Sequence, residues 1–317
     1  MKKIAALVLA LCMVLALVPA MAEGTTYHVG ILQLVQHNAL DAATKGFRDA
    51  LTEKLGDAVV FDEQNAQGES AQCAVIATGF VANKYDLIMA NATPALQACM
   101  NATFTIPVLG TSVTDYATAL DLESVAGGTG FNVSGTSDGV SPKLYAECLM
   151  ELVPEAKKVG VFYCSAEPNS IVQADGFIAE MTAYGVECVV ATFADSNDMQ
   201  IVLSGLVGDG IDALYIPTDN TAAANMTIVS NICEPAKLPV IPGEENMMAV
   251  GGLATVSISY YDIGYITGEM AYEILVNGAD IATMEIAYSP NAVKKYNPAF
   301  AAAIGFTVPE DYAAYGE

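Results

Sequence analysis

Tryptophan is absent from this chain of 317 residues, histidine occurs twice, and Lys and Arg together number 12 against 36 Asp and Glu. A formal net charge of −24 leaves no basic surface to neutralise phosphates, which excludes nucleic acid as a partner. Neither His28 nor His37 is spaced with a cysteine, so no zinc site is expected. We also expect no other metal and no cofactor. Without Trp, any aromatic contact with a ligand must come from Tyr or Phe.

Several catalytic and redox motifs are also missing. The chain has no GxxxxGK[ST], no HExxH and no GxGxxG after a strand, so nucleotide-binding and metallopeptidase functions lack support. It has no CxxC, and its six cysteines beyond residue 22 lie among apolar neighbours, which favours buried free thiols. An even number of cysteines in an exported chain also permits disulfides. The six are Cys73, Cys99, Cys148, Cys164, Cys188 and Cys233.

The N-terminus has the pattern of a secretory signal peptide over residues 1–22. Lys2 and Lys3 precede an apolar run over residues 4–18, and Ala20-Met21-Ala22 supplies a small-residue cleavage pattern. Cys12 follows the bulky Leu11 within the apolar run, so there is no clear lipobox. No later run reaches the length of a membrane span. We therefore expect an exported protein, periplasmic or extracellular and associated with the cell surface.

One segment occurs in two copies. "GILQLVQHNALDAATKGF" over residues 30–47 and "GVFYCSAEPNSIVQADGF" over residues 160–177 each read as an apolar strand, a polar corner and a helix, with the opening Gly sixteen residues before a Gly-Phe pair. Three pairs of identical residues occupy equivalent positions in the two halves of the chain. Their offsets are 130 residues for Gly30 and Gly160, 126 for Asp86 and Asp212, and 132 for Pro107 and Pro239. Three similar offsets indicate a duplicated lobe.

The alternation of strands and helices predicts an α/β fold with parallel sheets covered on both faces. The predicted lobe one comprises residues 27–115 plus 250–285, and lobe two comprises residues 130–244 plus 288–312. Ligands of such sheets bind beyond the carboxyl ends of the strands. The two polar corners are therefore expected to close together on one ligand.

The corners carry two kinds of candidate ligand-binding residue. Each corner ends a strand and opens a helix, so backbone N–H groups face the cleft. Short hydroxyl and amide side chains there suit a carboxylate: Asn91, Thr93, Thr111, Ser112, Asn169 and Ser170. Glu167, Asp219 and Glu244 suit an ammonium group, with Asp219 the first choice and Glu167 the second. Each of these residues can alternatively serve only as a helix cap.

A hydrolase is the main catalytic alternative. Gly135-Thr-Ser137-Asp-Gly139 matches GxSxG, the nucleophile elbow of the α/β hydrolases. In that fold the catalytic His follows the Ser, whereas His28 and His37 both precede Ser137. We interpret the segment as a turn between the lobes and expect no enzymatic activity.

Several segments resemble the ABC-transporter substrate-binding proteins of the tryptophan/tyrosine-binding type. They are "GILQLVQHNALDAATKGF", "ATPALQ", "GFNVSGTSDGVSP", "YCSAEPNS", "IPTDN", "GGLATVSISYYDIG" and "YNPAFAAAIGFTVPEDY". The resemblance implies a type I periplasmic-binding fold, with two Rossmann-like lobes joined by a three-crossover hinge. It also implies delivery of a small ligand, often an aromatic amino acid, to a membrane permease. Carried over to this chain, the family's pocket falls on Gln36, His37, Ala92, Thr93, Ser112, residues 165–170 (which include Ser165, Glu167, Asn169 and Ser170), Thr218, Asp219 and Asn220.

The sequence therefore predicts the exported solute-binding component of an ABC importer, which closes by hinge motion on an amino acid. We expect an aromatic amino acid, with a branched aliphatic one as the alternative. Tyr163 and Tyr215 precede the second-lobe corners and are candidate aromatic contacts, unless strand alternation turns them into the core. A ligand-sensing domain of a receptor is a further alternative, because the same fold serves both functions.

Overall fold

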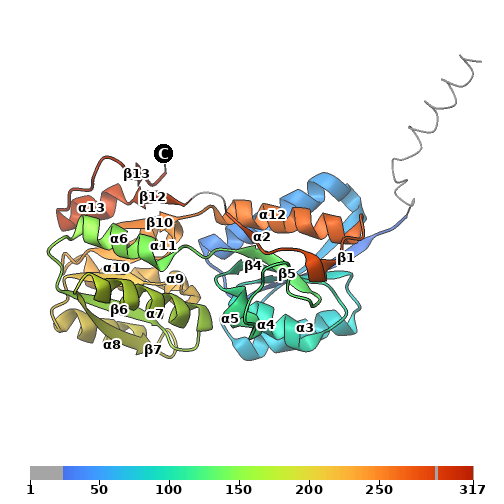
Figure 1. The fold of residues 1–317 in the computed structure, drawn as a ribbon, viewed down its shortest axis with the longest axis horizontal. Coiled ribbons are helices and arrows are strands. Elements are labelled where there is room, and N and C mark those ends of the chain that lie inside the picture. The colour runs from blue at the N-terminus through green and yellow to red at the C-terminus, as the bar shows by residue number, and fades with distance from the viewer. Residues whose placement is uncertain (1–23, 290–291, 317) are drawn as a thin grey trace, which may run out of the picture.

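The strands form three sheets, and Figure 1 shows them in two bodies that lie side by side. The structure is a computed structural model that describes residues 24–289 and 292–316, so the predicted signal peptide and Cys12 lie outside the described residues. The first sheet has the order β11-β5-β4-β3-β1-β2, and all its pairs are parallel. Its strands are β1 (Tyr27–Gln33), β2 (Val59–Asn65), β3 (Leu87–Asn91), β4 (Val108–Val113), β5 (Val133–Ser137) and β11 (Ala287–Tyr288).

The second sheet is also parallel, and the third is mixed. The second has the order β7-β6-β8-β9, with strands β6 (Lys158–Cys164), β7 (Glu187–Phe193), β8 (Ala213–Ile216) and β9 (Val240–Pro242). The third has the order β10-β12-β13, with strands β10 (Ala254–Ser257), β12 (Val293–Tyr296) and β13 (Ala313–Ala314). Leu253 N donates to Val240 O at 2.8 Å, which joins the start of β10 to β9. We call the first sheet with its helices lobe one, and the other two sheets with theirs lobe two.

Helices cover both faces of the lobe-one sheet. One face packs against α2 and α12 through a core that includes Phe47 and Met270, and the other packs against α3 and α4 through a core that includes Phe80 and Leu96. The helices of lobe one are α2 (Asn38–Leu55), α3 (Ser70–Ala82), α4 (Thr93–Ala102), α5 (Tyr116–Leu120) and α12 (Tyr260–Leu275). The helices of lobe two are α6 (Pro142–Leu152), α7 (Pro168–Ala183), α8 (Met199–Gly208), α9 (Asn220–Ala224), α10 (Met226–Cys233), α11 (Glu245–Gly251) and α13 (Pro298–Ile304). Short 3-10 turns occupy Gly56–Ala58 and Ile281–Thr283.

The repeated glycines have the same packing role in both lobes. A Cβ on Gly30 would lie 2.7 Å from the ring of Phe80 in α3, and one on Gly160 would lie 3.0 Å from Leu206 in α8. Each glycine therefore lets a side chain of the helix after the next strand, α3 after β2 or α8 after β7, pack directly on its own strand. Gly30 lies in β1 and Gly160 in β6, which belong to different sheets.

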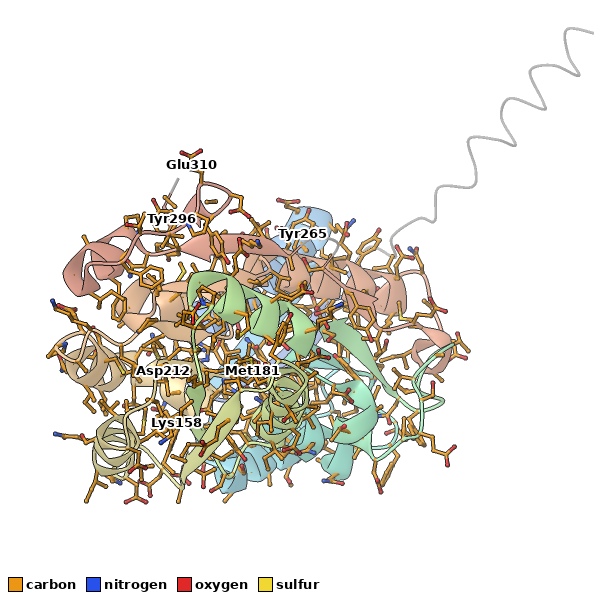
Figure 2. The ribbon with its side chains drawn as sticks, turned by 60° about the vertical axis from the view of Figure 1, so that its left-hand side comes forward. Lys158, Met181, Asp212, Tyr265, Tyr296 and Glu310 are labelled. Carbon is orange, nitrogen blue, oxygen red and sulfur yellow. The ribbon has the colours of Figure 1, made fainter. Side chains whose placement is uncertain are left out.

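The repeated aspartates also have equivalent contacts. Asp86 Oδ2 accepts a hydrogen bond from His28 N at 2.7 Å, at the start of β1. Asp212 Oδ2 accepts from Lys157 N and Lys158 N at 2.8 and 2.9 Å, at the start of β6. Figure 2 labels Lys158 and Asp212 in lobe two. These backbone hydrogen bonds lower the pKa of Asp212.

The predicted lobe boundaries differ from the observed pairing at two places. β5 pairs with β4, so residues 133–137 belong to lobe one instead of lobe two. β10 pairs with β12 and its side chains lie in the lobe-two core, so residues 254–257 belong to lobe two instead of lobe one. The chain therefore passes between lobes after β5, after β10, and between Tyr288 and Val293. Both misassigned strands are buried, and burial alone does not tell which sheet a strand joins.

The six cysteines of the described part are free thiols, and all except Cys188 are buried. Burial raises the pKa of Cys73 and of Cys164 to about 11, which keeps both thiols protonated. Among the described residues, no helix combines the length and the apolar composition that crossing a bilayer requires.

Glycines bring α2 and α12 into close contact, which gives a test of the fold. A Cβ on Gly264 would lie 2.0 Å from the carbonyl oxygen of Ala43, so the helix backbones would have to separate. We expect Gly264→Ala to lower the free energy of unfolding by about 1–3 kcal/mol. Gly205→Ala in α8 is the control, because its Cβ would meet no atom within 4 Å. We expect this control to raise stability by about 0.4–1 kcal/mol. Urea unfolding measures both, and equal effects would contradict the packing argument.

Candidate functional site

A small cavity lies between the lobes at the carboxyl ends of their strands. Its volume is about 10 Å³, on the order of a single water molecule. Residues of both lobes and of two crossovers line it: His37, Leu40, Ser112, Asp138, Thr218, Asp219, Asn220, Ala223, Glu244, Met247 and Tyr260. This is the position at which parallel α/β sheets bind ligands.

Asp219 is a buried carboxylate that organises the end of β8. It caps α9, with Oδ1 accepting from Ala222 N at 2.8 Å. Oδ2 accepts from Cys164 N at 2.7 Å and from the Ser170 hydroxyl at 2.8 Å. Burial, and then the charge of Glu167, raises the pKa of Asp219 to about 8.

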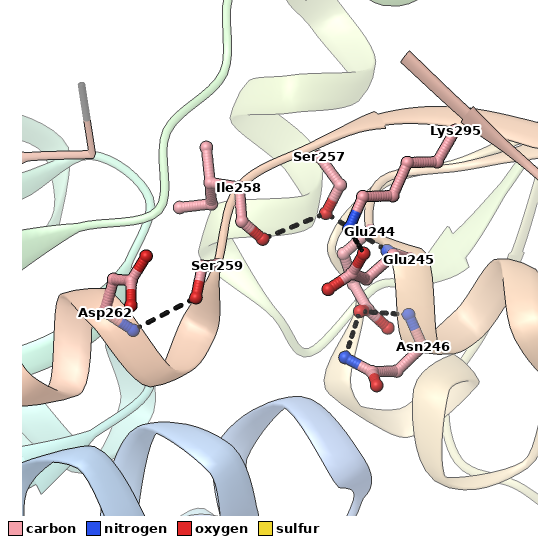
Figure 3. A network of polar contacts seen from close by, with 8 residues as sticks. All are labelled: Glu244, Glu245, Asn246, Ser257, Ile258, Ser259, Asp262 and Lys295. Carbon is pink, nitrogen blue, oxygen red and sulfur yellow. Dashed lines mark hydrogen bonds and ion pairs between the residues drawn. The ribbon is translucent and has the colours of Figure 1, made fainter. Parts of the chain in front are cut away.

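Glu244 has a similar position at the end of β9. It caps α11, with Oε1 accepting from Met247 N at 2.5 Å and Oε2 from Asn246 N at 2.6 Å. Burial raises the pKa of Glu244 to about 7. Figure 3 shows the contacts of Glu244 with Asn246 and the ammonium group of Lys295, which pairs with the adjacent Glu245. Lys295 is therefore paired with Glu245 and does not form an ion pair with Glu244.

Asp138 links the crossover after β5 to the start of α12. It follows β5, and its Oδ2 accepts from the hydroxyl of Tyr260, the first residue of α12, at 2.7 Å. Its Oδ1 accepts from the Thr114 hydroxyl at 3.0 Å. Burial raises the pKa of Asp138 above its ordinary value.

These three carboxylates share one cavity without a compensating positive charge. None of the described residues that line the cavity is Lys or Arg. Within the described part of the chain, no ion pair includes Asp138, Asp219 or Glu244. Burying unpaired charges is costly, so the cavity favours either protons or a cationic group.

Hydrogen bonds cross the cleft at two places. His37 Nε2 of lobe one lies 3.2 Å from Asn220 Oδ1 of lobe two. Gln173 of α7 donates through Nε2 to the Thr114 hydroxyl at 3.2 Å and also to the Thr218 hydroxyl. Thr114 follows the last strand residue of β4, so the two lobes are in direct polar contact at two separate places.

Lobe one presents strained backbone and unpartnered hydroxyls at the carboxyl ends of β3 and β4, and of these residues Ser112 lines the cavity. Ala92 directly follows β3 and Ser112 is the penultimate residue of β4; their φ angles of 91° and 54° are unfavourable for non-glycine residues. The buried hydroxyls of Thr93 and Ser112 have no hydrogen-bond partner among the described residues. Thr93 begins α4, and the preceding Ala92 provides no side-chain cap for this helix. Free donors at a helix start suit an anionic group.

Two other cavities lie close to this one. One of about 330 Å³ shares Asn220 with it and is bounded by Ser70 and Pro94 of lobe one and by Glu167 and Thr221 of lobe two. The other, of about 760 Å³, lies beside the first crossover; its carboxylates Glu123 and Glu285 are exposed, and its third, Asp115, is partly exposed and caps α5. Water stabilises the charge of an exposed carboxylate, so such a group gains less from a bound cation than the buried carboxylates of the small cavity do.

A sequence model of the family described as "ABC transporter substrate binding protein" matches residues 28–316. The chain belongs to this family. The chain is also 42% identical over 251 residues to the "Tyrosine-binding protein" of Clostridioides difficile (strain R20291), which covers 78% of this chain and 72% of that protein. The prediction of an ABC-transporter substrate-binding protein is confirmed. Members of this family bind small molecules and are typically exported or periplasmic.

Two solved structures show the state of the lobes. An ABC domain from Streptococcus pneumonia in complex with L-Trp has a TM-score of 0.86 at 31% identity, covering 92% of this chain and 99% of that one. The ligand-free, open structure of a substrate-binding protein with adhesive properties from Clostridium difficile has a TM-score of 0.69 at 40% identity, covering 91% and 99%. The more similar sequence has the less similar structure, which indicates that the lobes here are not in that open arrangement. The predicted α/β class and type I periplasmic-binding fold are confirmed.

Of the predicted site residues, six line the central cavity of this substrate-binding protein. They are His37, Ser112, Thr218, Asp219, Asn220 and Glu244. Glu167 lines the neighbouring cavity instead, and its carboxylate accepts hydrogen bonds from Asn220 and Thr221. It therefore positions the start of α9, and its carboxylate already accepts from five donors, the fifth being Asn169 Nδ2 at 3.5 Å. We no longer expect Glu167 to be the second partner of the ammonium group.

The remaining predicted residues lie outside the lining. Gln36 and Ser165 are exposed, and Ser165 donates its hydroxyl to Phe193 O at 3.2 Å. Asn91 is buried and donates to Leu40 O at 2.8 Å, so it ties β3 to α2. Asn169 donates to Thr218 O at 3.0 Å, and Ser170 holds Asp219.

Neither predicted tyrosine contact lines the cavity. Tyr215 is fully buried and stacks on Phe177, with ring centroids 3.9 Å apart, and Tyr163 packs partly buried against the same core. The aromatic residue of the cavity is Tyr260. Sequence reasoning missed Asp138, which lies on the crossover after β5, and Tyr260, which begins α12 directly after the crossover that follows β10, although both fall within quoted family-like segments.

Ser137 has no catalytic partner in the described part of the chain. Its hydroxyl donates to Thr114 O at 3.0 Å and accepts from Gly139 N at 3.0 Å. No hydrogen bond joins it to His28 or His37 in the described residues, and His37 faces Asn220. Among the described residues, no group of three or more His, Cys, Asp or Glu could hold a metal ion.

Proposed function

We propose that this substrate-binding protein takes an aromatic amino acid into the cavity between its lobes and carries it to a membrane permease without chemical turnover. The observation that carries the proposal is the set of buried carboxylates Asp138, Asp219 and Glu244, which line one cavity with no basic side chain beside them. An α-ammonium group supplies the missing positive charge and donates three hydrogen bonds. Asp219 remains our first candidate for its partner.

The carboxylate of the ligand would bind on the lobe-one side. Thr93 and Ser112 offer buried hydroxyls without partners among the described residues, and α4 begins beside them. Hydroxyls and helix N-terminal N–H groups stabilise an anion without needing an Arg or Lys. The zwitterion would therefore lie across the cleft, with its negative end toward lobe one and its positive end toward lobe two and the crossovers.

The ligand's side chain would contact the less polar part of the lining. Leu40, Met247 and the ring of Tyr260 supply apolar and aromatic surface there. The names of two similar proteins, one tyrosine-binding and one in complex with L-Trp, support an aromatic ligand. Tyr260 can pack against an aromatic ring edge-on or with an offset.

Binding requires the lobes to separate and close again. The present cavity of about 10 Å³ is too small for an amino acid, so the ligand would enter an open form. The crossovers after β5 and β10 would act as the hinge, linked by the Asp138–Tyr260 hydrogen bond. The residues of the predicted signal peptide lie outside the described residues, and export with their removal remains part of this proposal.

Calorimetric titration of the mature chain with tryptophan, tyrosine, phenylalanine and leucine tests the ligand class. We expect at least one aromatic amino acid to bind at least tenfold more tightly than leucine, because a ring buries more apolar surface and stacks on Tyr260. Tighter binding of leucine than of all three aromatic amino acids would overturn the aromatic assignment. Hydrolysis of a bound ligand would overturn the absence of turnover.

A further inference from the structure

A hydrogen-bonded chain fixes the orientation of Asn220. Glu167 Oε2 accepts from Asn220 N at 2.9 Å and from Asn220 Nδ2 at 2.7 Å. Glu167 Oε1 accepts from Thr221 N and from the Thr221 hydroxyl, both at 2.8 Å. The amide nitrogen of Asn220 thus faces Glu167, so its Oδ1, an acceptor, faces His37 across the cleft.

This orientation determines the tautomer of His37. An acceptor 3.2 Å from Nε2 requires that Nε2 carry the hydrogen. Burial lowers the pKa of His37, so the imidazole is neutral near pH 7 and Nδ1 is an acceptor. Nδ1 is buried and has no hydrogen-bond partner among the described residues, and His37 lines the cavity.

We propose that Nδ1 of His37 accepts a hydrogen bond from the side chain of the ligand, so that the site selects tyrosine or tryptophan over phenylalanine. This inference rests on the proposed function. The phenolic O–H of tyrosine and the indole N–H of tryptophan are the donors that the ring of phenylalanine lacks. The ammonium group of the ligand is not the donor, because the three carboxylates Asp138, Asp219 and Glu244 attract it more strongly than a neutral imidazole.

The selectivity follows from the cost of leaving a buried acceptor unpaired. A site with such an acceptor discriminates strongly against an analogue that lacks the matching donor. We expect phenylalanine to bind the unmodified protein about tenfold to a hundredfold more weakly than the better of tyrosine and tryptophan.

Two substitutions of His37 separate the roles of its nitrogens. His37→Gln places an amide near the position of Nε2, so it retains a donor to Asn220 and loses the acceptor at Nδ1. His37→Asn places its amide near Nδ1, so it retains an acceptor for the ligand and loses the contact with Asn220. We expect the preference over phenylalanine to fall to within about threefold in His37→Gln and to persist in part in His37→Asn. Titration calorimetry with the three aromatic amino acids measures each preference.

The outcomes are distinct. Equal binding of phenylalanine, tyrosine and tryptophan to the unmodified protein would overturn the inference without any variant. An equal loss for all three ligands in His37→Gln would also overturn it, since it would assign Nδ1 to the ammonium group or to structure alone. If none of the three binds and leucine does, the proposed function itself fails, which is a different result.

Discussion

Replacing Asp138 by Asn should weaken binding of the aromatic ligand by about a hundredfold or more, while the ligand-free protein remains at least as stable. Loss of one member of a buried charge pair costs about 3–5 kcal/mol, which corresponds to a factor of at least a hundred in affinity. In the ligand-free state the carboxylate of Asp138 has no cation, so removing its charge removes a desolvation cost. Binding and stability should therefore change in opposite directions.

Of the three carboxylates, Asp138 is the one whose charge can be removed by an amide substitution without loss of its hydrogen bonds. Both of its partners, Tyr260 and Thr114, are hydroxyls, which can either donate or accept. An Asn at this position can therefore keep both contacts by rotation of those hydroxyls. Asp219 and Glu244 accept from backbone N–H groups, so an amide there would place donor against donor.

Asp219→Asn serves as the comparison. We expect it to lose affinity and also to unfold at a lower temperature, because its cap on α9 is disturbed. Thermal unfolding with and without ligand measures both effects, since a ligand at a hundred times its Kd adds about 2.7 kcal/mol. Unchanged affinity of Asp138→Asn would contradict a contribution of Asp138 to binding the ammonium group, and unchanged affinity of Asp219→Asn would contradict its place as the first candidate.

The lobe architecture could be predicted because its signals are local and occur twice. Gly30 and Gly160 are required for the packing of Phe80 and Leu206, and Asp86 and Asp212 receive equivalent backbone donors. The boundaries could not be predicted in the same way. The strands at residues 133–137 and 254–257 are both buried, and their sheets are defined by pairing with distant residues.

The site was predicted where it lies at strand ends and missed where it lies on crossovers. His37, Ser112, Asp219 and Glu244 all occupy corners that the repeat identifies, and all line the cavity. Within one corner, however, the sequence does not show which side chain points inward, and Gln36 beside His37 is exposed. Asp138 lies in the site because the crossover after β5 contacts the start of α12, which is far away in the sequence.

Raising the pH should open the ligand-free protein. In the closed arrangement the pKa of Asp219 is about 8 and that of Glu244 about 7, and the pKa of Asp138 is also raised. Ordinary values for solvated Asp and Glu are about 3.9 and 4.3. Between these limits the closed form holds more protons than an open form with solvated carboxylates, so the stability of closure is present at low pH and lost as pH rises toward 8.

The expected change is large enough to measure by small-angle scattering. For each proton taken up on closure, the ratio of open to closed molecules changes by up to about tenfold per pH unit. The radius of gyration of the ligand-free protein should therefore increase between pH 5.5 and pH 8.5, and less steeply in Asp138→Asn, which lacks one titrating group. With saturating ligand the increase should disappear, because the ammonium group replaces the protons as the positive charge in the cavity. A radius that stays constant with pH in the ligand-free protein but decreases on adding ligand would show that the carboxylates do not control closure.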